Sequence, residues 1–410
     1  MKRQVLLPLR LTGFYTEEAS TTSGMQAFKA VQQSYTPTAE LLSLLDAFRR
    51  MVNECIRLGV AANVTSMKAL SKKAYHALAE YDVVTYYRLT AISKAAGILR
   101  NYRHARRRRR SVKPPYASKL MLTDCYGFRI IDGELRLPIR AREYVYIPLN
   151  AYVLRSIESY TVRAVCLTAC TVSVVFSKET VHLEAAGLIG VDCNLDNVTT
   201  AASGGDVRRY DLSRATAIKE NCRQAKRGFR RNDYRIGKRL YSKYGRIQRN
   251  KVNWILHNTS ASLVRQAKEK QFGIVMENLR GIRRLYRRGN GQGRDYRARL
   301  NGWSYAELQR QIAYKAQWEG LPVFYVHPSK TSSICATCGC HVAECAGRTV
   351  YCPRCGSLVD RDENAALNIV SAGLRFSLKG VAGEAMKGNP ERGQVIPGAD
   401  ATQLPHQPQR

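Results

Sequence analysis

The sequence lacks the features of membrane and secreted proteins. It contains no apolar run of about 18 residues, the least that a membrane-spanning helix needs. Its start, Met1-Lys-Arg-Gln, leads into a short strand-like run rather than a signal peptide. No internal repeat is visible, which argues against a repeat architecture. The 12 cysteines do not follow the pattern of a disulfide scaffold and indicate a reducing compartment. We therefore expect a cytoplasmic protein.

Acidic residues are also scarce. The 410 residues include 66 Lys and Arg against 32 Asp and Glu, which gives a formal net charge of +34 and a pI near 10.0. A compact protein sustains such a charge most readily with a polyanionic partner. The 23 tyrosines and the many arginines suit base stacking and phosphate contacts, so we expect nucleic acid. A merely soluble cationic protein is the alternative.

The first half of the chain combines helices with short strands. Residues 5–11 predict an edge strand because Pro8 interrupts them. Thr36-Pro37 predicts a helix start, and apolar residues then recur at helical spacing. A second helical region at 69–102 is followed by a run of arginines, which we expect to contact nucleic acid, a solvated face being the alternative. This run is Arg106, Arg107, Arg108, Arg109 and Arg110.

Residues 113–178 contain short segments of alternating apolar and polar residues. Asp132-Gly133, between two of these segments, is a hairpin turn signal. The pattern predicts an antiparallel β module, which we interpret as a small barrel. Its first strand would come from residues 5–11, with the helices inserted between.

From residue 188 the pattern becomes α/β, and its middle helical region is basic. Lys226, Arg227, Arg230 and Arg231 lie in that region and are candidate nucleic-acid contacts. The Gly, Pro and Gln content beyond about Ser377 predicts disorder. Strands are expected at 188–192, 198–202, 272–277 and 321–326, helices at 215–270 and 303–319, and a flexible loop at 283–299.

Three carboxylates stand out by their position. Asp192 and Glu277 each close an apolar strand, and Asp362 precedes a short apolar helix. In an open α/β sheet such side chains collect on one rim. There they suit two Mg²⁺ or Mn²⁺ ions about 4 Å apart, which activate a water and polarise a phosphodiester. Each acid alone is more typical of a cap or turn, and we interpret Asp360 as a cap or an ion-pair partner.

Two Cys-x-x-Cys knuckles precede Asp362. Their spacing is that of a zinc ribbon, and four thiolates complete one structural Zn²⁺ site without an open position. The predicted ligands are Cys335, Cys338, Cys352 and Cys355. Between the knuckles lie Cys340, His341 and Cys345, which we interpret as non-ligands. The scattered thiols are typical of small core residues: Cys55, Cys125, Cys166, Cys170, Cys193 and Cys222.

At these residues the chain resembles the TnpB proteins, RNA-guided DNA nucleases of insertion sequences that are similar to the compact type V CRISPR effectors. The resemblance covers residues 188–372, where the matching pieces follow the family's order. Residues 1–187 match only in their general pattern, a β module split by a helical insertion. The matching pieces are Gly190-Val-Asp192 followed by Asn194-Leu-Asp-Asn197, Val275-Met-Glu277-Asn-Leu, Tyr314-Lys-Ala leading to Gly320, Thr331-Ser332 and Asp360-Arg-Asp362-Glu-Asn364-Ala-Ala-Leu-Asn368-Ile369. Common family residues are replaced at Asn194, Asp196 and Ser333, but no predicted metal ligand is lost.

The resemblance implies a RuvC-type catalytic triad of Asp192, Glu277 and Asp362 on a ribonuclease-H-like fold, with Arg348 assisting at the phosphate. It implies guide RNA from the protein's own locus and target DNA as partners, a monomer on RNA, and specificity through base pairing. Readers of a target-adjacent motif would lie among Tyr86, Tyr87, Lys94 and Arg100, ordinary packing or phosphate contact being the alternatives.

The predicted fold is a multidomain α/β protein with a β-barrel, a helical insertion and a RuvC-like domain that carries an inserted zinc ribbon. The expected segments are the first part of the barrel (wedge) module at 1–30, the helical recognition insertion at 31–110, the rest of the barrel at 111–185, the RuvC-like domain at 186–330, the ribbon at 331–358, the last nuclease segment at 359–376 and a disordered tail at 377–410.

The function predicted is an RNA-guided, metal-dependent DNA endonuclease of a transposable element, which cuts beside a short adjacent motif and associates with the nucleoid rather than a membrane. One alternative is a guided repressor, or a transposition accessory protein, that binds DNA without cutting. Another is a transposase that joins strands itself. The three acids favour the nuclease over the first alternative, and the ribbon beside a compact RuvC-like pattern favours it over the second.

Overall fold

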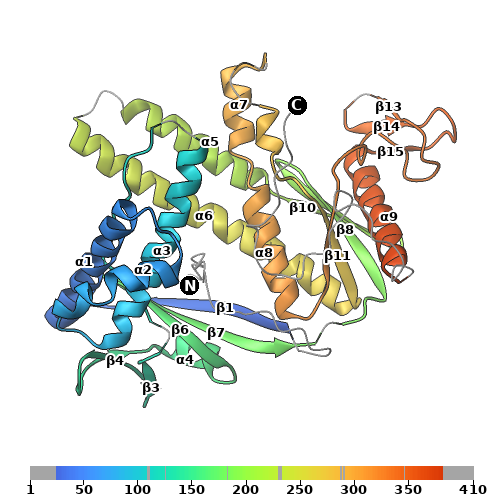
Figure 1. Cartoon of the computed structure of the whole chain (residues 1–410). Coiled ribbons are helices and arrows are strands. Elements are labelled where there is room, and N and C mark those ends of the chain that lie inside the picture. Colours follow the sequence, from blue (N-terminus) through green and yellow to red (C-terminus); the bar gives the residue numbers. More distant parts are fainter. Residues whose placement is uncertain are drawn as a thin grey trace. The chain divides into compact units, whose positions relative to one another are not determined.

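The computed structural model describes residues 25–108, 111–124, 126–181, 183–229, 233–286, 289, 291–345 and 347–381. The chain divides into two compact units, Met1–Glu179 and Thr180–Arg410, whose elements are labelled in Figure 1. Within the described ranges, no helix has both the length and the apolar character needed to cross a membrane. Outside them lie the predicted strand at 5–11, Cys125, Arg109, Arg110, Arg230, Arg231 and the tail from residue 382.

The first unit contains two β-sheets. The strands of the four-stranded sheet follow the order β1-β7-β6-β2, and those of the three-stranded sheet the order β3-β4-β5. Their bounds are β1 (Met25–Ser34), β2 (Met121–Asp124), β3 (Arg129–Ile131), β4 (Glu134–Arg140), β5 (Glu143–Pro148), β6 (Thr161–Thr168) and β7 (Thr171–Thr180).

The predicted hairpin at Asp132-Gly133 is confirmed. Both residues have positive φ, 50° and 79°, and they connect β3 to β4 with the geometry that tight hairpin turns require. Each short segment predicted between 113 and 178 contributes to a strand, whereas β1 was not anticipated. The described strands form two sheets, and closure into a single barrel stays a prediction.

The helices of the first unit pack through apolar faces. They are α1 (Ala39–Ala61), α2 (Met67–Ala74), the 3-10 helix η1 (Ala77–Glu80), α3 (Thr85–Arg108) and α4 (Ala151–Ile157). The buried face of α1 contains the residues that the helical spacing picked out, which confirms that prediction. The predicted start at Thr36-Pro37 is wrong, because Thr38 is the N-cap and its hydroxyl accepts a hydrogen bond from the Leu41 amide at 3.3 Å.

The second unit is built on a five-stranded mixed sheet of order β10-β9-β8-β11-β12. Strand β11 pairs in parallel with β8 on one side and with β12 on the other. Strand β9 pairs antiparallel with both β8 and β10. The bounds are β8 (Gly187–Cys193), β9 (Asn197–Ala202), β10 (Val207–Asp211), β11 (Phe272–Glu277) and β12 (Val323–Val326). The four strands predicted from residue 188 onward are confirmed, and β10 is additional.

Helices cover both faces of this sheet, as Figure 1 shows. Residues of α6 and α8 pack with Ile189 and Val191 of β8, while residues of α9 pack with Leu188 on the opposite face. The helices are α5 (Ser213–Gly228), α6 (Tyr234–Glu269), the 3-10 helix η3 (Ile282–Arg284), α7 (Arg294–Asn301), α8 (Tyr305–Trp318) and α9 (Arg361–Val381).

Two predictions about irregular segments are wrong in part. The loop expected at 283–299 contains the end of η3 and the first six residues of α7, which runs from Arg294. Residues 377–381 belong to α9 rather than to a disordered tail. Among the scattered cysteines, Cys55, Cys166, Cys193 and Cys222 are buried as expected, but Cys170 is exposed.

Helix α9 approaches the sheet closely because β8 carries a glycine where the two elements cross. A Cβ atom added at Gly190 would lie 2.4 Å from the Ala366 carbonyl oxygen and 2.9 Å from the Val370 amide nitrogen. Both are backbone atoms, so no side-chain rotation relieves the overlap. Gly190 therefore sets the distance between β8 and the first turns of α9.

A second sheet of this unit, β13-β14-β15, precedes α9. Its short antiparallel strands are β13 (Ala343–Glu344), β14 (Thr349–Tyr351) and β15 (Leu358–Asp360). The first cysteine knuckle precedes β13, and the second lies in the turn between β14 and β15. Because β15 leads directly into α9, this small sheet is joined to the helix that carries Asp362.

Candidate catalytic and metal sites

Strand alternation places two of the predicted acids on the same face of the sheet. Val191 and Met276 lie opposite each other in parallel strands and belong to the core shared with α6 and α8. The next residues along each strand, Asp192 and Glu277, therefore point to the other face, where α9 packs. They end neighbouring strands at the same edge of the sheet.

The third acid is presented by the first turn of α9. Asp362 is 2% exposed. Asp360 caps this turn, since its Oδ1 accepts hydrogen bonds from the backbone amides of Asp362 at 2.8 Å and Glu363 at 3.3 Å. Arg209 of β10 forms an ion pair with Asp360 at 2.7 Å. The interpretation of Asp360 as a cap and ion-pair partner thus agrees with its contacts.

A chain of amide hydrogen bonds connects Asp192 to Asp362. The Asn194 side-chain amide donates to Asp192 Oδ2 at 2.7 Å and to Asn197 Oδ1 at 3.3 Å. Asn197 in turn donates to Asp362 Oδ2 at 3.2 Å. On the other side, the Thr331 hydroxyl donates to Glu277 Oε1 at 2.6 Å. Each carboxylate is thereby held in a fixed orientation by at least one neutral neighbour.

Sequence reasoning missed these three neutral residues. Asn194 was noted only as a departure from the family, and Asn197 and Thr331 only as parts of matching pieces. The available signal was the density of short polar side chains within a few residues of each strand-ending acid, in a stretch where the flanking strands are apolar.

Burial and like charge oppose ionisation in this cluster. Burial, followed by the charge of Glu277, raises the pKa of Asp192 from 3.8 to about 7, while the hydrogen bond from Asn194 acts in the opposite direction. Burial also raises the pKa of Glu277, although the Thr331 hydrogen bond partly offsets it. Three acids brought together in a poorly solvated place would be stabilised by a cation.

Arg348 supplies part of that positive charge. One of its guanidinium nitrogens lies 2.6 Å from Oδ1 and 2.5 Å from Oδ2 of Asp362. Its backbone carbonyl also accepts a hydrogen bond from the Arg361 amide at 2.7 Å, which ties the residue before β14 to the start of α9. The Arg348 side chain remains 45% exposed, so it can turn away from Asp362 without unpacking a core.

The acid cluster has the donor chemistry of a Mg²⁺ or Mn²⁺ site. Its ligand atoms are hard carboxylate oxygens on rigid elements, and their mutual repulsion is relieved by a divalent ion. Among the described residues, however, one group of three or more His, Cys, Asp or Glu has ligand atoms close enough to share an ion, and that group is the four cysteines. The carboxylates would draw together further to share a cation.

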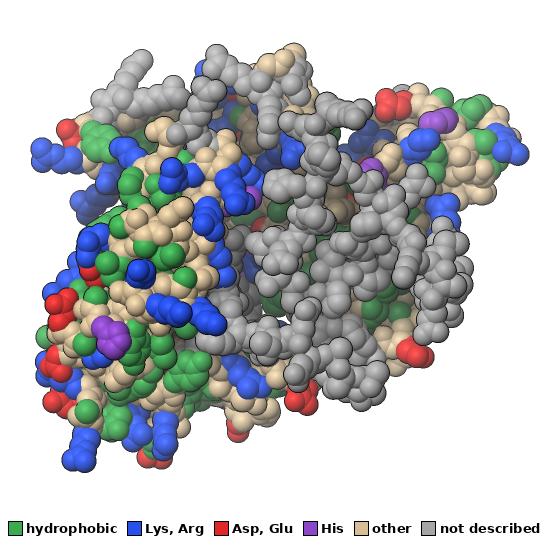
Figure 2. Space-filling model, in the orientation of Figure 1, with side chains coloured by type: hydrophobic (Ala, Val, Ile, Leu, Met, Phe, Trp, Pro, Cys, Tyr) green, Lys and Arg blue, Asp and Glu red, His purple; other side chains and the backbone are tan. Residues whose placement is uncertain are grey.

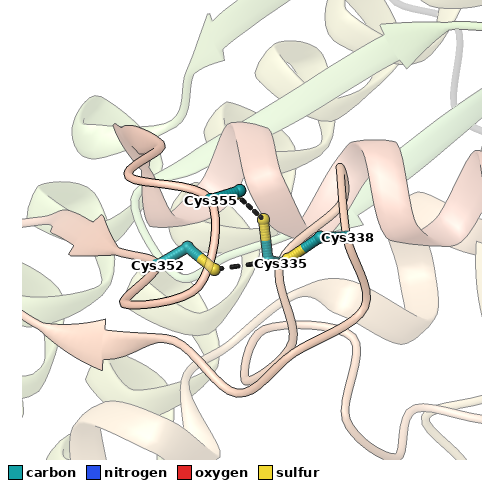
Figure 3. Close-up of side chains that lie close together, drawn as sticks. All are labelled: Cys335, Cys338, Cys352 and Cys355. Carbon is teal, nitrogen blue, oxygen red and sulfur yellow. Dashed lines mark hydrogen bonds between the residues drawn. The ribbon is translucent and has the colours of Figure 1, made fainter.

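The four predicted zinc ligands lie together, as Figure 3 shows. Their sulfur atoms all lie within 4.8 Å of one another, with 3.7 Å between Cys335 and Cys355 and 3.4 Å between Cys338 and Cys352. A tetrahedral site with Zn–S bonds of about 2.3 Å places sulfur atoms about 3.8 Å apart. The set can therefore hold one zinc ion with little movement.

Both knuckles have the same backbone turn. The Gly339 amide donates to the Cys335 carbonyl, and the Gly356 amide to the Cys352 carbonyl, each at 2.9 Å. Both glycines have positive φ, 74° and 73°, which favours glycine over other residues. Cys340, His341 and Cys345 are outside the group of four, in agreement with their interpretation as non-ligands.

Five of the basic residues predicted to contact nucleic acid lie at the ends of α3 and α5. Figure 2 shows that Lys and Arg side chains predominate over Asp and Glu on the face it draws. The exposed residues Arg106, Arg107 and Arg108 end α3, whereas Lys226 and Arg227 lie in the last turn of α5, the first half-buried and the second exposed. These positions are compatible with contacts to phosphate.

The prediction that Tyr87 contacts nucleic acid is wrong, and the same prediction for Tyr86 and Lys94 is weakened. Tyr87 is fully buried, and its hydroxyl donates to the Pro138 carbonyl at 2.9 Å. Lys94 donates to the Met121 carbonyl at 3.0 Å, and burial lowers its pKa to about 8. Tyr86 packs edge-on against Tyr87, with ring centroids 4.7 Å apart. The alternative of ordinary packing describes Tyr87 and Lys94 better.

Comparison with known proteins supports the family resemblance. Residues 305–369 match the family described as Cas12f1-like, TNB domain. A TnpB-like protein of Methanocaldococcus jannaschii is 28% identical over 59% of this chain and 91% of its own length. The CRISPR-associated endodeoxyribonuclease Cas12f1 of Sulfoacidibacillus thermotolerans is 33% identical over 28% of this chain and 25% of its own.

The fold agrees with these sequence matches. The structure of a Cas12f1–sgRNA–target DNA complex superposes with a TM-score of 0.54 over 81% of each chain, at 13% sequence identity, which shows a shared mixed α/β multidomain fold. The matched segment includes both cysteine knuckles and Asp362. The chain is therefore similar to TnpB-like proteins and to the compact type V effectors.

Proposed function

We propose that this protein is an RNA-guided DNA endonuclease that depends on divalent metal ions and cuts DNA beside a short adjacent motif. The observation that carries the proposal is the convergence of Asp192, Glu277 and Asp362 at one edge of the sheet, next to the cysteine knuckles. The names of the relatives, which include a CRISPR-associated endodeoxyribonuclease, support the same reaction.

The proposal includes a finer description of the fold. Residues 186–330 and 359–376 would form a RuvC-like, ribonuclease-H-like nuclease domain, and residues 331–358 a zinc ribbon inserted in it. The strands on either side of the helical segment 31–110 would form the barrel module. The mixed sheet with α6 and α8 on one face and α9 on the other supports the first assignment.

In this proposal the acids hold two divalent cations, which when bound would orient a water and stabilise the leaving oxygen of the phosphodiester. Asn194 and Thr331 keep the carboxylates turned toward the site. Arg348 leaves Asp362 and donates to a non-bridging oxygen of the scissile phosphate, for which its exposed side chain has room. The same guanidinium would thereby balance the acids before binding and the phosphate during cutting.

The proposed partners are a guide RNA and a target DNA. The net charge of +34 supplies the phosphate attraction, and the exposed arginines that end α3 offer a place for it. The complex named in the structural comparison contains an sgRNA and target DNA, which supports this pair of partners. Base pairing, rather than protein contacts, would then select the target.

Zinc would have a structural role. Four thiolates leave no coordination position for water, so the ion cannot activate a nucleophile. Its proposed effect is to fix the small sheet that carries Arg348 and leads into the first turn of α9. The ribbon would thus position two catalytic side chains without taking part in the reaction.

The test is a cleavage assay on the protein co-expressed with RNA from its own locus. The RNA that co-purifies is sequenced, and matched DNA with a randomised flank is supplied with Mg²⁺. We expect Asp192→Ala to abolish cutting and leave RNA binding nearly unchanged, whereas Glu184→Gln, a change at an exposed acid, keeps full activity. Absence of bound RNA would refute the guided function. Bound RNA without cutting by the native protein or by Asp192→Ala would favour a guided repressor.

A further inference from the structure

A large pocket lies among α5, α6, α7 and α8, on the side of the second unit where the loop after β8 begins. Its volume is about 990 Å³. Its walls contain eight basic side chains, Lys219, Arg223, Lys226, Arg227, Arg283, Arg294, Arg299 and Arg310, against two acidic ones, Glu220 and Glu307. The excess of basic over acidic side chains in this lining suits a polyanion.

We propose that this pocket binds the phosphodiester backbone of the DNA strand that is delivered to the acid cluster. The inference rests on the proposed function, because it assigns a path to the strand that Asp192, Glu277 and Asp362 would cut. It adds a binding site that the three acids and the ribbon do not account for. Lys226 and Arg227, first singled out by charge alone, become parts of one wall.

The basic residues of α5 form a row of suitable length. Lys219, Arg223 and Arg227 recur at four-residue spacing and so project from one face of the helix. From the first to the last the helix rises about 12 Å, at 1.5 Å per residue. A single phosphate cannot contact such a row, whereas consecutive phosphates of one strand can.

Two arginines of this row already bind a carboxylate that resembles a phosphate in its contacts. Asp295 of α7 accepts hydrogen bonds on one oxygen from Arg223 at 3.0 Å and from Arg227 at 2.7 Å. Its side chain is 71% exposed, so no packing fixes it there. Two guanidinium groups on one oxygen atom is also the arrangement by which arginines hold a phosphate.

The pocket lies beside the segment that follows Asp192, although none of the three acids lines it. Leu195, which lines it, lies three residues after Asp192. The Trp303 indole, another wall, donates to the Asn194 carbonyl at 2.8 Å, and the Asn194 side chain holds Asp192. The wall of the pocket is thus joined to Asp192 through Asn194. This adjacency favours the DNA that is cut over the guide RNA as the occupant.

Lys219 lines the pocket as well. Its ammonium donates to the Gly302 carbonyl and the Ser304 hydroxyl, which lie between α7 and α8. Burial, and then the charge of Arg283, lowers the pKa of Lys219 to about 8. The eight basic side chains against two acidic ones concentrate positive charge in this pocket, as expected of a site that receives anionic phosphate.

The test is DNA binding rather than cutting, so that it does not depend on an active metal centre. Protein that carries Asp192→Ala and its co-purified RNA is titrated with labelled single-stranded DNA at several salt concentrations. In this background Lys226→Gln with Arg294→Gln removes two pocket cations. Lys238→Gln with Arg239→Gln makes the same charge change at exposed positions of α6 that do not line the pocket.

Each lost single-strand phosphate contact reduces the slope of log affinity against log salt by about 0.7, so the pocket variant should lose about 1.4 and the control little. Asp295→Asn should instead tighten binding roughly 2- to 5-fold, since a competing carboxylate is removed. Melting curves verify that each variant is folded. Equal slopes in the pocket variant and the control, or weaker binding by Asp295→Asn, would overturn the proposal. Loss of the guide RNA with unchanged DNA binding would overturn the choice of occupant.

Discussion

The acid cluster predicts that a catalytic substitution stabilises the protein when metal is absent. Burial and Glu277 raise the folded-state pKa of Asp192 from 3.8 to about 7. Its ionisation is therefore less favourable in the folded than in the unfolded protein. Stability that is fully present below about pH 4 is lost as pH rises to about 7 and stays lost above it.

The magnitude follows from the same shift. One pH unit of pKa difference corresponds to about 1.4 kcal/mol, so ionised Asp192 lowers the free energy of unfolding by about 4 kcal/mol at pH 8. Asp192→Asn removes this charge and keeps an oxygen that can accept from Asn194. For a protein of this size the melting temperature should rise on the order of 10 °C at pH 8. The gain should vanish near pH 4.

The assay is thermal unfolding in a chelator at pH 4.5 and pH 8, followed by the same scan with Mg²⁺. Mg²⁺ should raise the melting temperature of the native protein at pH 8 and leave Asp192→Asn almost unaffected, because the variant has lost a ligand. Glu184→Gln, at an exposed acid, is the control and should change neither curve. A melting temperature of Asp192→Asn below that of the native protein at pH 8, without metal, would refute the reasoning.

Three further predictions concern the surroundings of the cluster. Gly190→Ala should cost about 1–3 kcal/mol of stability and most of the cutting activity, because the added Cβ would lie 2.4 Å from the Ala366 carbonyl oxygen. Melting curves and cleavage rates measure the two effects, and a native melting temperature together with a native cleavage rate would contradict this prediction. Cys352→Ser should release zinc and lower the yield of folded protein, as metal analysis and unfolding scans would show; unchanged zinc content would count against the ribbon. Arg348→Ala should slow cutting by roughly 10²- to 10³-fold while RNA binding persists. The same variant should bind Mg²⁺ more tightly, because the Asp362 carboxylate loses the guanidinium that competes with the ion. Equal Mg²⁺ affinities of the variant and the native protein in calorimetry would argue against that competition.

Much of the second unit could be predicted because β8, β9 and β11 are buried on both faces. Four apolar runs bounded by polar residues identified β8, β9, β11 and β12, and the acids at two strand ends followed from the same pattern. The positions of Asp192, Glu277 and Asp362 near one edge agree with that expectation. What metal they hold, and whether they cut, stay predictions.

The remaining features depend on contacts between distant residues. The Asn194 and Asn197 amides connect two acids that are 170 positions apart, from Asp192 to Asp362, and no local pattern reveals such a bridge. Tyr87 illustrates the opposite failure. Its position on a basic helix suggested nucleic-acid contact, but packing against Phe48 and the hydrogen bond to Pro138 bury it. Propensity does not show which face of such a helix meets a neighbouring sheet.

The α7 helix was missed for a similar reason. Its sequence is rich in arginine and preceded by glycines, which is typical of a loop. The helix is nevertheless connected to α5 by the Asp295 ion pairs with Arg223 and Arg227. Tertiary contacts therefore support a helix that local composition disfavours. Only the structure shows that the loop region and the basic helix enclose a pocket.

The central claim is that three carboxylates form a metal-dependent centre that cuts RNA-matched DNA. It is tested most directly by incubating the purified protein–RNA complex, native or Asp192→Ala, with matched and mismatched DNA in Mg²⁺ and in chelator. We expect cleavage only by the native complex, only of matched DNA and only with Mg²⁺, at equal RNA content in both proteins. Equal cleavage by Asp192→Ala, or cleavage by the native complex in chelator, would contradict it.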